Sequence, residues 1–336
     1  MRSKHSERIV MMAVHNSIDV NGGHQVIMAT MREFIQQLPK AELHVHLEGS
    51  IEPTTLLEIA PHLSHTEVQA RYHYENFGEF LKNFGWVAKH LTEPEHYAIA
   101  TRRLLQRLEE QNVQYAEITL SAGVILWKNQ DPAAVHQAVR EAAATSPIPV
   151  YWIWDAVRQW GVDRAWQAME LAAARVNDGV IAFGLGGDEA NGPARDYAAL
   201  FQQARAKGLR LLCHAGEVTN ADSIWQALEI GAERIGHGIR AIDDPALLHH
   251  LKANDIPLEV CVSSNVCTGA ITSLPEHPLR KLFDAGVPLI LNTDDPPMFH
   301  TTLHQEYEVA ASHFQFTEAE LTQLAANSFR YAFRTL

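Results

Sequence analysis

Two histidines separated by one residue give the first chemical signal in the chain. His44 and His46 lie in an apolar segment typical of a β-strand, so both imidazoles are expected on the same face. His214 and Asp294 also stand where apolar segments end. Three imidazoles and a carboxylate, with one position left for water, form a catalytic zinc site. We predict one zinc ion per chain, although a His-x-His pair alone would be weak evidence among 19 histidines.

Three further ionisable residues lie close to these ligands in the sequence. His237 is flanked by glycines that let substrate approach, and it is a candidate base or orienting group for the attacking water. Glu217 follows the third histidine by three residues, and a carboxyl group buried there would keep a proton to donate. Asp295 adjoins the carboxylate ligand and could accept a hydrogen bond. Each residue taken alone could equally be a structural loop residue, but together they predict hydrolysis.

The candidate site residues lie at or near the ends of eight short apolar segments. These segments alternate with amphipathic helical patterns. Several of the segments are nearly continuous apolar runs, which are typical of strands buried on both faces. Eight strand–helix units in about 300 residues predict a (β/α)₈ barrel of the TIM type, whose active sites lie where the strands end. A doubly wound open sheet is the alternative, but no Gly-x-Gly-x-x-Gly follows the first strand. The expected strands are 42–47, 115–121, 149–155, 180–185, 210–214, 234–236, 258–262 and 288–292.

The segment between the first two expected strands, 51–112, is long for one connection. It contains a helical pattern with Phe77, Phe80 and Phe84 three or four residues apart. We predict a helical lid inserted after strand one, with Phe80 and Phe84 as candidate substrate contacts. Ordinary packing of the helix would produce the same spacing.

The remaining sequence predicts a single metal-dependent hydrolase domain over residues 31–336, after a loosely ordered arm at 1–30. The apolar patch in the arm is too short for a signal peptide. The net charge of −13 and the lack of a basic stripe argue against nucleic acid as a partner. No apolar run approaches the about 18 residues of a membrane span. Three cysteines without a paired motif fit the cytoplasm. The expected partner is a small molecule, and no protein partner is indicated.

Four segments in order resemble the signatures of the adenosine deaminase family in the amidohydrolase superfamily. They are 38–50 (LPKAELHVHLEGS), 214–217 (HAGE), 234–238 (RIGHG) and 292–296 (NTDDP), and the resemblance extends from about residue 31 to the C-terminus. It implies that His44, His46, His214 and Asp294 bind one zinc ion. It also implies that Glu217 protonates the purine ring, that His237 handles the water, and that Asp295 contacts both water and a ring nitrogen.

The same resemblance points to two further substrate contacts. Gly187 matches the family glycine whose backbone N–H contacts the purine. Glu48 stands where adenosine-specific members usually carry an aspartate that meets the ribose 5′-hydroxyl. Glutamate there resembles the adenine deaminases and the relatives that act on larger nucleosides. Thr268-Gly269-Ala270, however, resembles a patch that adenine deaminases tend to lack.

The leading prediction is therefore zinc-dependent hydrolytic deamination of an adenosine-type 6-aminopurine nucleoside. Adenine and aminodeoxyfutalosine are the alternative substrates. A metallo-hydrolase of esters or lactams would need no acid aimed at a purine ring, and a non-catalytic relative would normally lack the acid or the base.

Overall fold

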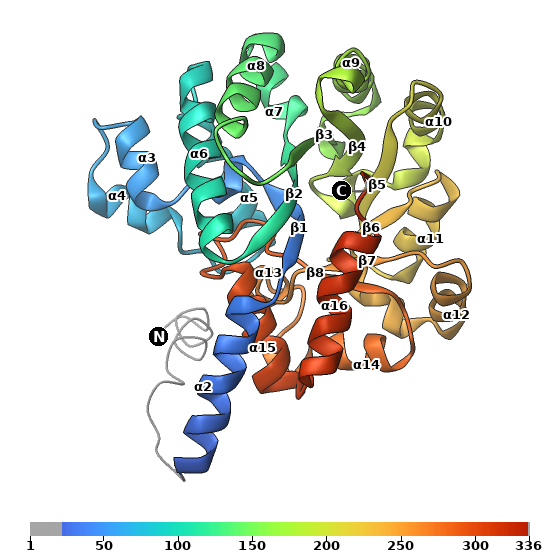
Figure 1. Cartoon of the computed structure of the whole chain (residues 1–336). Coiled ribbons are helices and arrows are strands. Elements are labelled where there is room, and N and C mark those ends of the chain that lie inside the picture. The colour runs from blue at the N-terminus through green and yellow to red at the C-terminus, as the bar shows by residue number, and fades with distance from the viewer. Residues whose placement is uncertain (1–21, 335–336) are drawn as a thin grey trace.

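The computed structural model describes residues 22–334, and its centre is one sheet of eight parallel strands in the order β1 to β8. The circle closes between β8 and β1 through a parallel bridge from Val45 to Asp294. There His46 N donates to Asp294 O at 2.9 Å, and Asp294 N donates to His44 O at 2.8 Å. Figure 1 shows the helices arranged around these strands. The barrel predicted from the sequence is confirmed.

Each strand lies within or close to its expected segment, because the strands are the runs that the barrel buries on both sides. The burial of β1, β4, β6, β7 and β8 is complete along their length. The strands are β1 (Lys40–His46), β2 (Val113–Leu120), β3 (Val150–Val157), β4 (Val180–Gly186), β5 (Arg210–Ala215), β6 (Arg234–His237), β7 (Leu258–Val260) and β8 (Leu289–Leu291).

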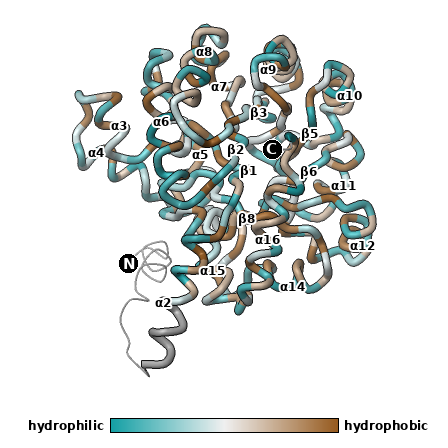
Figure 2. Tube along the Cα trace, in the orientation of Figure 1, coloured by the Kyte–Doolittle hydropathy of each residue, from teal (hydrophilic) through white to brown (hydrophobic). Residues whose placement is uncertain are grey.

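The outer helices follow local sequence signals. Asp131 caps α8 by accepting a hydrogen bond from Ala133 N, and Asn220 caps α11 in the same way. Hydrophobic and hydrophilic residues alternate along these helices in Figure 2, as expected for helices with one face on the barrel. The α-helices are α2 (Gly22–Gln37), α3 (Pro53–Ile59), α4 (His65–Arg71), α5 (Phe77–Lys89), α6 (Pro94–Glu110), α7 (Ala122–Trp127), α8 (Pro132–Ala143), α9 (Val162–Ala173), α10 (Ala198–Ala206), α11 (Ala221–Glu229), α12 (Pro245–Ala253), α13 (Val262–Cys267), α14 (Leu279–Asp284), α15 (Leu303–Phe314) and α16 (Glu318–Arg330).

Short 3₁₀-helices occupy several connections after the strands and beside the helices. They are η1 (Glu48–Ser50), η2 (Arg158–Trp160), η3 (Val176–Asp178), η4 (Glu189–Asn191), η5 (Ala194–Tyr197), η6 (Ile239–Asp243) and η7 (Leu274–Glu276).

The long insertion between β1 and β2 is helical, as expected, and consists of α3, α4, α5 and α6 after η1. Helix α5 starts where the Asn76 side chain accepts a hydrogen bond from Glu79 N. Its Phe80 is buried and packs near Phe299, with ring centroids 5.0 Å apart. Phe299 follows β8, so α5 is held against the connection that follows the barrel's last strand.

The N-terminal arm predicted for residues 1–30 is described only in part. Residues 22–30 belong to α2, which extends away from the barrel in Figure 1, while residues 1–21 lie outside the described residues. Among the helices of residues 22–334, none is long and apolar enough to cross a membrane.

Candidate active site

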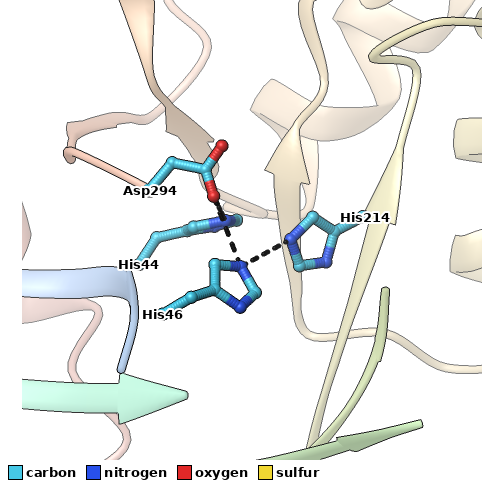
Figure 3. Close-up of side chains that lie close together, drawn as sticks. All are labelled: His44, His46, His214 and Asp294. Atoms are coloured by element: carbon cyan, nitrogen blue, oxygen red, sulfur yellow. Dashed lines mark hydrogen bonds and ion pairs between the residues drawn. The ribbon is translucent and has the colours of Figure 1, made fainter. Parts of the chain in front are cut away.

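The three histidines and the aspartate predicted to bind metal meet at the C-terminal mouth of the barrel. β1 supplies His44 and His46, β5 supplies His214, and Asp294 follows β8. One ligand atom from each lies within 4.8 Å of all the others, and Figure 3 shows the side chains converging. Nε2 of His46 lies 3.3 Å from Nε2 of His214 and 3.3 Å from Asp294 Oδ1.

Neighbouring residues orient this cluster from outside. His44 Nδ1 lies 2.8 Å from Glu259 Oε2, and the Ser264 hydroxyl donates to Asp294 Oδ2 at 2.7 Å. Such outer contacts fix which imidazole nitrogen faces a metal. His44 Nε2 is buried without a hydrogen-bond partner, as expected for an atom that ligates an ion. Burial lowers the pKa of His46 to about 4 and that of His214 well below its usual range, which keeps both rings neutral. The donor set therefore fits a divalent metal.

His237 lies next to this cluster at the end of β6. Its backbone has a φ of 62°, and burial lowers the pKa of its ring to about 4. The Asn265 amide holds Nδ1 at 3.1 Å, while Nε2 faces Glu217 Oε2 at 3.7 Å and Asp294 Oδ2 at 3.9 Å. The neutral ring of His237 thus turns its Nε2 towards the metal-ligand cluster and towards the carboxyl group of Glu217.

Glu217 lies in the loop after β5, and a second carboxylate holds this loop in place. Glu189 Oε1 accepts from Gly216 N at 2.5 Å. Its Oε2 accepts from the backbone N–H groups of Glu217, Val218 and Thr219 at 3.2, 3.0 and 3.2 Å. Burial raises the pKa of Glu217 well above its usual range, and the charges of Asp294 and Glu189 add to the shift. Glu217 can therefore hold a proton at neutral pH.

Asp295 lies deep in the site, beside the first connection of the barrel. Its side chain is buried, and both burial and the charge of Asp294 raise its pKa well above the usual range. A Cβ atom at Gly49 would lie 1.4 Å from Asp295 Oδ1, so only glycine leaves room for this carboxyl group. The close approach of the Asp295 carboxyl group therefore explains why residue 49 is glycine.

A single pocket gathers most of these groups. Among the residues predicted to form the site, His44 and Glu48 are the ones outside its lining. The described lining consists of His46, Phe77, Phe80, Leu81, Phe84, Gly85, Ser121, Val124, Trp127, Asp155, Val157, Gln159, Trp160, Gly187, His214, Glu217, His237, Asp294 and Asp295.

Glu48 has a different environment from the one expected of a sugar contact. It is fully buried, and its Oε1 accepts a hydrogen bond from Ser121 N at 3.1 Å. Burial, with the nearby Asp155 charge, raises the pKa of Glu48 to about 7. Its substrate role stays a prediction that the pocket lining does not support.

Several pocket residues were not singled out from the sequence. Asp155 ends an expected strand, so the logic applied to the other strand ends could have found it. Trp127 and Trp160 stack at 5.9 Å between centroids, and they come from two different connections. Gln159, which lines the pocket, and Glu189, which holds the loop of Glu217 from outside the lining, lie in 3₁₀-helices whose positions no sequence pattern indicated.

Fold and site together define a metal-dependent hydrolase built on a (β/α)₈ barrel. The sequence model of the adenosine deaminase family matches residues 39–335. The chain is 36% identical over 317 residues to the aminodeoxyfutalosine deaminase of Streptomyces avermitilis, covering 90% of this chain and 88% of the relative. It is 36% identical over 305 residues to the adenine deaminase of Rhizobium rhizogenes, covering 88% and 95%.

A solved structure is similar along nearly the whole chain. The adenine deaminase from Arthrobacter aurescens superposes with a TM-score of 0.84 at 28% identity, covering 89% of this chain and 94% of that one. The chain belongs to the adenosine deaminase family, and it is an enzyme of the purine deaminase class.

Proposed function

We propose that this enzyme is a zinc-dependent deaminase of a 6-aminopurine, with adenine or a 5′-extended adenosine derivative as substrate. The observation that carries the proposal is the proton-holding Glu217, which faces His237 across the pocket beside the metal ligands. The sequence pointed first to adenosine. The relatives named above and the position of Glu48 favour the alternatives, because Glu48 does not line the pocket where a ribose 5′-hydroxyl would lie.

The reaction replaces the 6-amino group with oxygen: aminopurine and water give the 6-oxopurine and ammonia. A bound zinc ion lowers the pKa of water and so supplies a nucleophile at neutral pH. The residues that would hold one such ion are His44, His46, His214 and Asp294. Glu217 donates its proton to a ring nitrogen, which makes C6 electrophilic. His237 takes the first proton that water loses and passes it to the departing amine. The second proton of the water returns to Glu217 as C6 becomes a carbonyl. Asp295 hydrogen-bonds the water and a second ring nitrogen, and Gly187 N–H binds the purine edge.

The residues in the outer part of the pocket favour a purine that carries either an uncharged substituent or no substituent. Phe77, Phe84, Trp127 and Trp160 line this region, and no Lys or Arg belongs to the described lining. A 5′-phosphate would be buried there without a cation, which is unfavourable. An aromatic extension on the sugar, in contrast, would pack against these rings. We propose that α5 acts as the lid, with Phe80 and Phe84 over the substrate.

Three further points belong to the proposal. The site takes a small molecule, and the net charge of −13 disfavours nucleic acid as a partner. Cys213, Cys261 and Cys267 are all free and buried, which supports a cytoplasmic location.

A deamination assay on adenine, adenosine, a 5′-phosphorylated adenosine and aminodeoxyfutalosine tests the proposal. We expect turnover of adenine or aminodeoxyfutalosine, loss of turnover with a chelator, and recovery with added zinc. Preference for adenosine would restore the first prediction from the sequence. Zinc-loaded protein that deaminates none of the four would refute the assignment.

A further inference from the structure

Another buried acidic group, Asp155, lines the pocket in addition to the groups already described. Asp155 lies near the end of β3, only 5% of it is exposed, and it lines the pocket beside Ser121. Its Oδ1 is buried without a hydrogen-bond partner, and so is Oε2 of the adjacent Glu48. The mechanism proposed above uses neither carboxyl group.

The neighbouring strand is shaped to leave room for Asp155. β4 carries glycine at both positions that face this side chain. A Cβ atom at Gly184 would lie 3.4 Å from Asp155 Cβ, and one at Gly186 would lie 3.1 Å from Asp155 Oδ2. Gly187, the expected contact of the purine edge, follows directly. The same Cβ atom at Gly186 would lie 3.6 Å from the His214 ring, so Asp155 lies where β4 leads into Gly187, close to a metal ligand.

The Ser121 side chain hydrogen-bonds the Asp155 carboxylate and the charge of His44 acts on it, but Oδ1 has no hydrogen-bond partner. Lys128 is the nearest positive group to act on Glu48, but its Nζ already donates to Ala88 O, Leu91 O and Tyr97 Oη. A buried acceptor without a partner is unfavourable and rare in folded proteins. The missing partner of Asp155 is then expected to arrive with the ligand.

We propose that Asp155 is a substrate subsite that accepts a hydrogen bond from an N–H or O–H donor on the five-membered-ring side of the purine. This inference rests on the proposed function. A free base presents its ring N–H there, and a nucleoside presents sugar hydroxyls, so the same acceptor serves either source. Burial raises the pKa of Asp155 to about 6, which leaves the group mainly ionised, and therefore an acceptor, at neutral pH.

Substrate pairs that differ in these donors, by the ring N–H of the base or by the 2′- and 3′-hydroxyls of the sugar, test the subsite. The base pair is adenine and 9-methyladenine, and the nucleoside pair is adenosine and 2′,3′-dideoxyadenosine. For at least one pair we expect wild-type enzyme to prefer the donor-bearing member by about tenfold or more in kcat/KM. Asp155→Asn should abolish that preference by slowing the donor-bearing member alone. Asp131→Asn, the same change at an exposed helix cap, serves as the control.

Two readouts separate this subsite from other roles. Equal slowing of both members of each pair, with metal content unchanged, would overturn the proposal. Loss of metal from Asp155→Asn would instead make Asp155 a support of His214, whose Nδ1 also lacks a partner. If Asp155→Asn does not fold, Asp155→Ser is measured in its place.

The subsite can be tested even if the proposed deaminase activity is not found. If the wild type deaminates no purine, calorimetric binding of adenine and 9-methyladenine still tests the subsite. Tighter binding of adenine that Asp155→Asn removes would support it, and equal binding of the two would refute it for a free base. Adenosine and 2′,3′-dideoxyadenosine are compared in the same way.

Discussion

Asp294 and Asp295 are adjacent and chemically identical, yet their surroundings give them opposite ionisation. Asp294 is buried, but His44, whose Nε2 lies 3.6 Å from Asp294 Oδ1, and the other nearby imidazoles hold its pKa below the usual range. Burial and the charge of Asp294 push the pKa of Asp295 well above that range. One carboxyl group is thus prepared to bind a cation, and the next can carry a proton. Such pairs with divergent pKa values are typical of sites that run acid and base chemistry together.

Glu217 carries the clearest prediction at this scale. Because its pKa is raised, the proton needed for donation is present at neutral pH and is lost as the pH rises through that pKa. We expect kcat/KM to decline on the alkaline side, above the usual carboxyl range. Glu217→Gln should lower kcat/KM by about 10²–10⁴-fold and remove that alkaline decline. A pH profile of both proteins, each with its metal content measured, provides the test. Near-wild-type turnover by the variant would exclude Glu217 as the acid.

At the scale of the elements, strands were the part of the fold most open to prediction. The run 287–291 is apolar throughout, and 209–213 is apolar except for the exposed Arg210, because the barrel buries both faces of its strands. His214 and Asp294 could therefore be placed from the sequence. The outer wall of the pocket could not be predicted from the sequence, because it depends on how connections that are far apart in the chain pack against one another. Trp127 and Trp160 stack from α7 and η2, a contact that no local pattern encodes.

Glu189 shows the same limit in the loop after β5. Its carboxylate accepts hydrogen bonds from a loop that starts 27 residues later, so no short motif links the two. Although burial opposes its ionisation, hydrogen bonds from Ser223, Thr219 and the loop N–H groups hold the pKa of Glu189 below its usual range. Glu189 therefore fixes the position of Glu217 and presents it with a permanent negative charge.

Replacing Glu189 should expose both effects. Glu189→Gln removes the charge and turns an amide donor towards N–H groups, so we expect kcat/KM to fall by about tenfold or more. The alkaline limb of the pH profile should also move to lower pH, because Glu217 loses a neighbour that favours its protonated form. Ser223→Ala is the matched control, since it removes one hydrogen bond and keeps the charge. An unmoved limb in Glu189→Gln would show that Glu189 is only structural.

Across the whole molecule, a chain of buried charges connects the two ends of the barrel. Glu259, which holds His44, forms an ion pair with Arg234 Nε at 2.6 Å, and Arg234 Nη2 donates to Glu117 Oε2 at 2.6 Å. Phe333 closes this chain at the bottom, where its ring lies 3.7 Å from the Arg234 guanidinium and its N–H donates to Glu117 Oε1 at 2.6 Å. The C-terminal segment therefore shields from water the charges that support the metal ligands.

The two ends of this chain should nevertheless respond differently to mutation, because barrel enzymes keep chemistry at one face and stability at the other. Phe333→Ala leaves the backbone N–H in place but removes the buried ring, and should lower the unfolding free energy by about 3 kcal/mol. Its zinc affinity should stay near that of the wild type, because Glu259 still holds His44. Arg334→Ala, an exposed neighbouring position, is the control.

Ser264→Ala, at the mouth of the barrel, should have the opposite effect to Phe333→Ala: it should change zinc affinity and leave stability unchanged. It removes the hydroxyl that donates to Asp294 Oδ2, and should weaken zinc binding by about tenfold while the metal-free protein keeps its stability. Denaturant unfolding with chelator measures stability alone, and competition with a zinc indicator measures affinity alone. If Phe333→Ala also weakened zinc binding by tenfold, the buried charges would transmit a disturbance from one end of the barrel to the other. The two faces would then not be independent, and the C-terminal segment would be part of the metal site's support.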